Sequence, residues 1–233
     1  MVKAVDIINR CEESLYNEEV TTNLRIHSIS SIKCAAHTLQ LAVKDFMLSL
    51  ESVEVIEKAS KIVKLLRTPS FRYLIAEESL PQPVLDVATR WCSTYQMLKK
   101  LQTFQSFCEK HLKPSLKLTS GDWDEIGELT ETFEPAFIAT EKLQSSQLFM
   151  GDFYKLWVDL KLTITVSKAT HSQVLRQYIE DREESLFANN AVLCSIYLDP
   201  RIRRVLLQKP LSLMLARPQL KGLLAQIFNI KKV

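Results

Sequence analysis

Two residue pairs in this sequence have the spacing of metal ligands. Cys34-x-x-His37 and Cys108-x-x-His111 could together supply four ligands to a zinc ion. The same residues also suit structural roles, because Cys34 would close a buried strand, and Cys108 and His111 fall at a helix end, where the dipole favours histidine. We therefore predict no metal site. His37 could instead act near an active site by polarising DNA or a carboxylate, or could simply form a buried hydrogen bond.

The pair Arg90-Trp91 has the chemistry of nucleic-acid recognition. An arginine guanidinium pairs with phosphate, and a tryptophan indole stacks on an unpaired base. The alternative is that Trp91 fills a joint between two parts of the fold. Both residues are kept as candidate DNA contacts.

Cations flank this pair along the sequence. After Arg90, only Glu109 opposes a run of five lysines: Lys99, Lys100, Lys110, Lys113 and Lys117. Before it, only Glu57 opposes a second run: Lys58, Lys61, Lys64, Arg67 and Arg72. These cations could contact phosphates, and the alternative is a solvated helical face. The acids between residues 122 and 134 form one acidic helix that would repel DNA, so a DNA-binding face must lie elsewhere.

Composition indicates a globular, helical protein. The chain has 233 residues, of which 46% are hydrophobic and 24% charged, which is not the composition of a disordered protein. Only 4 glycines occur, which disfavours an all-β sandwich. The net charge of +3 is too small to indicate nucleic-acid binding by itself, so local patches of charge matter more.

The sequence also indicates a compartment. The 5 cysteines are odd in number and loosely spaced, which favours a reducing compartment over a disulfide framework. Polar residues interrupt the N-terminal segment, so it does not resemble a signal peptide. No uninterrupted apolar run reaches the roughly 18 residues that a membrane span needs. We expect a cytosolic or nuclear protein without a membrane association.

Apolar periodicity predicts helices along most of the chain. The expected helices cover residues 2–16, 35–47, 53–66, 70–77, 93–111, 120–143, 153–169 and 173–197, with a weaker apolar helix from Pro210. Ser120-Gly121-Asp122 is expected to cap the sixth helix, and Pro135 to kink it. Residues 81–83 predict an extended connector, and Leu198-Asp199-Pro200 predicts a helix end.

One strand is predicted, over residues 26–33, where β-branched residues are common and helix formers are sparse. A lone strand would leave its backbone hydrogen bonds unpaired. We therefore expect it to be the last strand of a sheet whose other strands lie outside this sequence.

Three segments, in order, resemble the hAT superfamily of DNA transposases. Residues 32–41, IKCAAHTLQL, are similar to the family's C-x-x-H-x-L-x-L segment. Residues 88–98, ATRWCSTYQML, are similar to its T-R-W-N-S-T-Y-x-M-L, and residues 197–201, YLDPR, to its L-D-P-R. The resemblance extends from residue 1 to about residue 204. The second segment is the most specific, although Cys92 stands where the family usually has asparagine.

The resemblance implies an RNase H-like domain with three acidic metal ligands and a large all-helical insertion between the second and the third. It places the second acid just upstream of Met1 and the third beyond Val233. The acids Asp6, Asp45 and Asp86 match none of these positions and fit ordinary surfaces. The resemblance also implies that Trp91 stacks on a flipped base. The alternative is that Trp91 fills the joint between the core and the insertion.

We therefore predict a mainly α protein, with the end of an RNase H-like α/β core over residues 1–50 (helix, strand, helix) and a helical insertion region over residues 51–233. We expect a domesticated, hAT transposase-derived fragment in the nucleus that is not an enzyme, has no catalytic residues and needs no cofactor. Its partners would be DNA, a hAT-type relative or another nuclear protein. Residual DNA binding would use Arg90, Trp91, His37, Lys99 and Lys100. The alternatives are a helical protein-interaction module without a nucleic-acid role, and a fragment that does not fold stably.

Overall fold

The fold is described from a computed structural model. It describes residues 34–50, 53–87, 90–145, 148–187 and 190–202, with residues 216, 218, 220–222 and 224 beyond them. These residues belong to one compact unit that spans residues 32–233. In the described ranges, helix is the regular secondary structure, and β-pairing is limited to an isolated bridge between Val87 and Arg90. No helix in this part of the chain is long and apolar enough to cross a bilayer.

The described helices follow one another along the chain. They are α2 (Ala35–Ser49), α3 (Val53–Leu66), α4 (Pro69–Glu77), α5 (Trp91–Gln102), α6 (Gln105–His111), the 3₁₀ helix η1 (Pro114–Leu116), α7 (Ser120–Leu143), α8 (Met150–Val166), α9 (Ser172–Phe187) and α10 (Asn190–Leu198). The predicted mainly helical fold is thus confirmed. The helix expected over residues 2–16 and the strand expected over 26–33 lie outside the described residues, so the RNase H-like core is not confirmed.

One of the expected helices is divided in two. The helix expected over residues 93–111 is interrupted at Thr103 and Phe104, where the Thr103 hydroxyl donates to the Lys100 carbonyl at 2.8 Å. The Phe104 amide donates to the Leu101 carbonyl at 2.8 Å, so the turn tightens, and the Phe104 ring is fully buried. The residues expected to form one helix over 173–197 fall in α9 and α10, and residues 188 and 189 between them lie outside the described residues.

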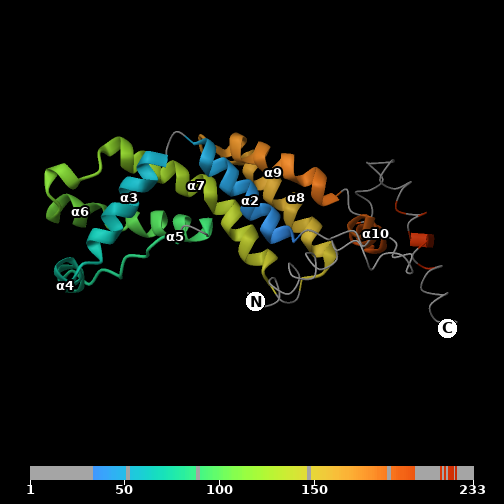
Figure 1. Ribbon diagram of the computed structural model, residues 1–233, viewed down its shortest axis with the longest axis horizontal. Coiled ribbons are helices and arrows are strands. Elements are labelled where there is room, and N and C mark those ends of the chain that lie inside the picture. The colour runs from blue at the N-terminus through green and yellow to red at the C-terminus, as the bar shows by residue number, and fades with distance from the viewer. Residues whose placement is uncertain are drawn as a thin grey trace, which may run out of the picture. The chain divides into compact units, whose positions relative to one another are not determined.

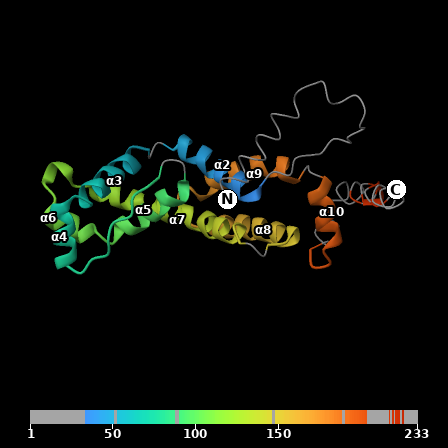
Figure 2. The same cartoon turned by 60° about the horizontal axis from the view of Figure 1, so that its bottom comes forward.

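The long helix α7 connects two groups of helices. Figure 1 shows α3 beside the N-terminal part of α7 and α8 beside its C-terminal part. α5 packs along the middle of α7, where Lys99 meets Glu134 and Tyr95 meets Phe137, and α2 packs there too, through Phe46 on Phe133. α9 completes the second group by packing against α2 and α8, and Figure 2 shows α10 beyond the end of α8. Pro135 lies inside α7 and does not end it. The predicted domain boundary at residue 50 stays a prediction, but α2 packs within this helical unit, against α7 and α9.

Phe133 of α7 lies where the two groups meet. Its ring is fully buried and packs edge-to-face on Phe46 of α2, with the ring centroids 5.8 Å apart. The Trp91 ring of α5 also packs against Phe133, with the ring centroids 6.0 Å apart. Phe46 extends the cluster to Tyr178 of α9 at 6.2 Å. Four helices therefore share one aromatic core around a single side chain.

The acids of α7 hold neighbouring elements in place. Glu134 lies 2.6 Å from the Lys99 ammonium of α5, and Asp122 lies 3.2 Å from the Lys58 ammonium of α3. Glu128 accepts a hydrogen bond from the Thr170 amide at 2.7 Å, and Glu125 lies 3.1 Å from the His171 ring. Thr170 and His171 come just before the start of α9. Since these four acids already have partners, the expectation of one DNA-repelling acidic face overstates the free negative charge.

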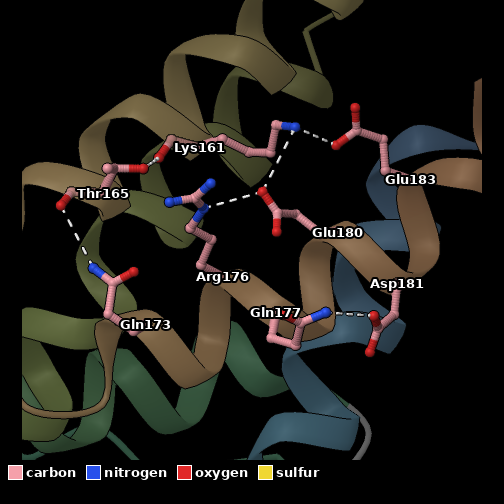
Figure 3. Close-up of polar contacts among 8 residues, drawn as sticks. All are labelled: Lys161, Thr165, Gln173, Arg176, Gln177, Glu180, Asp181 and Glu183. Carbon is pink, nitrogen blue, oxygen red and sulfur yellow. Dashed lines mark hydrogen bonds and ion pairs between the residues drawn. The ribbon is translucent and has the colours of Figure 1, made fainter.

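Polar contacts also join α8 to α9 (Figure 3). The Lys161 ammonium of α8 lies 2.6 Å from Glu183 Oε2 and 3.9 Å from Glu180 Oε1 of α9. Arg176 donates to the same Glu180 oxygen at 3.0 Å, one turn earlier on α9. Because Lys161 and Glu183 are largely shielded from water, this network fixes the register of the two helices better than exposed pairs would.

The start of α7 is fixed by a capping box. The N-cap is Thr119 rather than the expected Ser120-Gly121-Asp122 segment: its hydroxyl accepts from the Asp122 amide at 3.1 Å, and its own amide donates to Asp122 Oδ2 at 2.8 Å. This backbone hydrogen bond from Thr119 is the main reason that the pKa of Asp122 is lowered from its ordinary value of 3.8, and Lys58 lowers it further.

We predict that Thr119→Ala lowers the free energy of unfolding by about 1 kcal/mol, the usual cost of losing an N-cap side chain. A carboxylate with a lowered folded pKa stabilises the fold above its unfolded pKa and loses that effect as the pH falls through the folded value. The wild type should therefore lose stability as the pH falls below 3.8, and the variant, which lacks the Thr119 hydroxyl but keeps its amide, should lose slightly less of it. Urea unfolding at pH 7 and at low pH measures both effects.

Ser120→Ala is the matched control, because Ser120 is exposed in the first turn and lies outside the capping box. It should change the free energy of unfolding by less than about 0.5 kcal/mol. An equal loss in both variants would contradict the role given to Thr119.

Candidate nucleic-acid interface

Arg90 is the N-cap of α5 and is exposed. Its amide donates to the Val87 carbonyl at 2.8 Å. The Ser93 hydroxyl donates to the Arg90 carbonyl at 2.6 Å and accepts from the Val87 amide at 2.7 Å. The serine three residues after the arginine thus closes the turn that starts α5. This turn fixes the backbone of Arg90 while its side chain reaches solvent.

Trp91 is placed in the core. Its side chain is only 6% exposed and packs against Phe133 of α7. The indole nitrogen is buried and has no hydrogen-bond acceptor among the described residues. A ring in this position cannot stack on a base unless it leaves the core, so the arrangement favours the packing role over base stacking.

Lys99 and Lys100 have different surroundings on α5. The Lys99 ammonium lies 2.6 Å from Glu134 and 2.9 Å from the Tyr95 hydroxyl. The hydrogen bond to Glu134 is the main reason that the pKa of Lys99 is raised, so its charge is already compensated by a carboxylate. Lys100 is half-buried and has no ion pair in the described part of the chain. Of the two, Lys100 is the freer cation.

His37 and Cys34 are both exposed at the start of α2. Cys108 is buried, and burial raises the pKa of its thiol to about 12, which disfavours the thiolate that a metal requires. His111 Nε2 lies 2.7 Å from Glu78 Oε1, so its ring is already paired. No three histidine, cysteine or acidic side chains are grouped to hold a metal ion in the ranges that the structure describes.

The LDPR segment, residues 198–201, contacts the first turn of α8. The Asp199 carboxylate accepts from the Arg201 guanidinium at 2.6 Å, and this contact is the main reason that the pKa of Asp199 is lowered. Arg201 also lies 2.8 Å from Asp152 in the first turn of α8. Gly151, next to it, faces the Asp199 carboxylate so closely that a Cβ atom would overlap it. The segment therefore has a structural role, and it leaves no room for a Cβ atom at residue 151 unless the Asp199 side chain moves.

A groove between α3 and residues 115–119 was not anticipated. It combines lysines with apolar side chains, namely Lys58, Lys61, Ile62, Leu65, Leu116, Lys117 and Leu118. In sequence the lysines are possible phosphate contacts, and no local pattern connects them to Leu116. The signal available in the sequence was the spacing of residues 58, 61, 62 and 65, which places them on one face of a helix.

Comparisons with known proteins agree with the family resemblance at a coarse level. Residues 32–132 match the family model described as the ZBED1 RNase-like helical domain, which supports a relationship to hAT-like proteins. Over 175 residues, covering 60% of this chain, the sequence is 27% identical to the "Putative transcriptional regulator tpeD" of Talaromyces stipitatus. The aligned region is 20% of that relative, so the chain spans about a fifth of its length. No solved structure matches.

We predict that Trp91→Ala lowers the free energy of unfolding by about 3–5 kcal/mol, because it leaves a cavity beside Phe133. Trp91→Phe should cost less than about 1.5 kcal/mol, since it keeps an aromatic ring and removes only an unpaired N–H. Urea unfolding measures both values. If Trp91→Ala is as stable as the wild type but binds single-stranded DNA more weakly, the ring serves base stacking and the packing role is wrong.

We predict that Gly151→Ala lowers the free energy of unfolding by about 1–3 kcal/mol, because the added methyl group must displace the Asp199 carboxylate. Gly121→Ala in the first turn of α7 is the matched control, since its Cβ would lie 3.8 Å from the nearest atom, Thr119 Oγ1. The control should be neutral or stabilising by up to about 1 kcal/mol. Thermal unfolding compares the two, and equal stability would contradict the close approach of Asp199.

Proposed function

We propose that the chain is the helical domain of a hAT-derived nuclear protein that acts in DNA-associated regulation by binding rather than by catalysis. The match to the ZBED1 RNase-like helical domain supports the origin. The relative named as a transcriptional regulator supports the regulatory role and, with it, a nuclear location. The DNA contact in this proposal is made with phosphates and does not depend on base sequence.

The observation that carries the proposal is that the cations of α5 differ in ion pairing. Arg90 is exposed and Lys100 is half-buried, and neither has an ion pair among the described residues. Lys99, between them in sequence, is neutralised by Glu134. Two uncompensated charges, one at the N-cap and one in the last turn of α5, suit phosphate contacts. His37 is a further exposed candidate at the start of α2.

The partners of two acids support a non-catalytic role. Asp45 of α2 accepts from the Arg182 guanidinium of α9 at 3.0 Å. Asp86 accepts from the Ser60 hydroxyl of α3 at 3.0 Å. Two-metal catalysis needs carboxylates that converge on two ions about 3.5–4 Å apart. These two carboxylates instead bind separate structural partners.

The second candidate function is a helical protein-interaction module. The groove along α3 favours it, because apolar side chains such as Leu116 remain exposed there. In that case α5 would have no DNA role, and the module would be recruited through protein contacts alone. DNA binding that weakens with salt separates the two functions.

We predict that the chain binds duplex DNA weakly and that the logarithm of its affinity falls linearly with the logarithm of the salt concentration. Replacing Arg90 and Lys100 together with glutamine should reduce that slope by about 2, or about 0.9 for each lost phosphate contact. Fluorescence anisotropy between about 50 and 200 mM salt covers the useful range.

The charge-matched control replaces Lys155 and Lys168, both exposed outside α5, with glutamine. Its slope should equal that of the wild type. Equal effects of the two double variants would assign binding to net charge and not to α5. No binding by the wild type at low salt would leave the protein-interaction module as the better function.

A further inference from the structure

One face of α3 forms a wall of a groove with a volume of about 450 Å³. Lys58, Lys61, Ile62 and Leu65 line it, and their spacing of i, i+3, i+4 and i+7 places them on a single helical stripe. The opposite wall is the segment of residues 115–119 that leads into α7. The volume lies in the range of about 300–1,000 Å³ that is usual for ligand-binding clefts.

The groove is mainly apolar. Ile62 and Leu65 line it from α3, and Leu116 and Leu118 line it from the other wall. Leu116 remains 48% exposed, whereas Leu118 and Ile62 are buried. Apolar surface that stays exposed beside charged residues is typical of a docking site. An occupant of this groove therefore needs apolar side chains.

The charges around the groove are more positive than negative. Lys61 is exposed and has no ion pair among the described residues. The Lys117 ammonium donates to the Glu109 carbonyl, which satisfies a hydrogen bond without cancelling the charge. Lys58 is shared between Glu54 and Asp122, each at 3.2 Å.

Asp122 is the only acid among the groove-lining residues, and its carboxylate is already satisfied. One oxygen accepts from the Thr119 amide and hydroxyl, each at 2.8 Å, and the other accepts from Lys58. Lys61 and Lys117 are thus left to attract the acids of a partner. They flank the apolar side chains from the two walls of the groove.

We propose that this groove binds an acidic amphipathic peptide segment of a partner protein. Leucine-like side chains of the segment fill the space between α3 and Leu116, and its carboxylates pair with Lys61 and Lys117. This is the helix-in-groove mode of peptide recognition, in which apolar anchors give affinity and flanking charges give orientation. The site is separate from α5, so it stands whether or not α5 binds DNA.

The apolar lining decides between a peptide and a nucleic acid. A phosphate backbone gains nothing from Ile62, Leu65 or Leu116. The apolar side chains of an amphipathic peptide can instead pack on these residues and remove exposed leucine from water. The combination of lysines and leucines therefore favours the peptide.

The test uses the intact chain and a fluorescein-labelled helical peptide of about 14 residues, or four turns. The peptide carries leucine at positions i, i+3, i+4 and i+7 and glutamate on its flanks. Two matched peptides replace the glutamates with lysine or the leucines with serine. Fluorescence anisotropy should show binding of the first peptide and at least about tenfold weaker binding of the other two.

Two groove variants, Lys61→Glu and Leu116→Ser, should each raise the Kd of the acidic peptide by about tenfold or more. Two controls, Lys64→Glu on α3 and Leu162→Ser on α8, lie outside the groove-lining residues, and both side chains are exposed. They should change the Kd by less than about twofold. Circular dichroism confirms that each variant is folded, and all four sites are exposed enough for that to be expected.

The proposal is overturned if groove and control variants weaken binding equally, or if the acidic and basic peptides bind alike. It is also overturned if duplex DNA displaces the peptide and loses affinity on Lys61→Glu, since the groove would then be a phosphate site. A loss of DNA binding on replacing Arg90 and Lys100 bears only on the function proposed for α5, so failure of one proposal leaves the other open.

Discussion

The packing of Phe133 between Phe46 and Trp91 is the constraint on which the described fold depends. α7 has 24 residues and contacts both groups of helices, so its buried face must fit α5 and α2 at once. A side chain that is fully buried between two groups leaves neither free to shift alone. This is why the functional candidates on α5 are held on a rigid element and not on a loop.

Charge on this protein is organised by pairing across long sequence separations. Glu134 and Lys99 are 35 residues apart, and Asp45 and Arg182 are 137 residues apart. Each pair joins two helices that periodicity alone cannot bring together. The formal charge of a segment is therefore a poor guide to its surface potential. Four carboxylates of the acidic α7 pair with neighbouring elements, and Lys99 is paired with one of them, whereas Lys100 has no ion pair among the described residues.

Local patterns predicted the elements well and the site only in part. The helix over residues 53–66 was predicted with the bounds it has, because its apolar spacing is regular and a Thr-Pro pair follows it. The division at Thr103 and Phe104 could not be predicted, since it depends on where the Phe104 ring must be buried. Arg90 lies exposed, as a phosphate contact requires. A tryptophan that stacks on DNA and one that fills a core look the same in sequence, so the position of Trp91 required tertiary structure.

The burial of the indoles has an optical consequence. The protein has 3 tryptophans, and their side chains are 6%, 8% and 0% exposed at Trp91, Trp123 and Trp157. All three belong to the same core, on α5, α7 and α8. Unfolding moves every indole from an apolar environment into water at once. Both groups of helices contain a tryptophan, Trp91 on α5 and Trp157 on α8, so both contribute to the same emission. Intrinsic fluorescence therefore reports on the unfolding of the whole bundle without any added label.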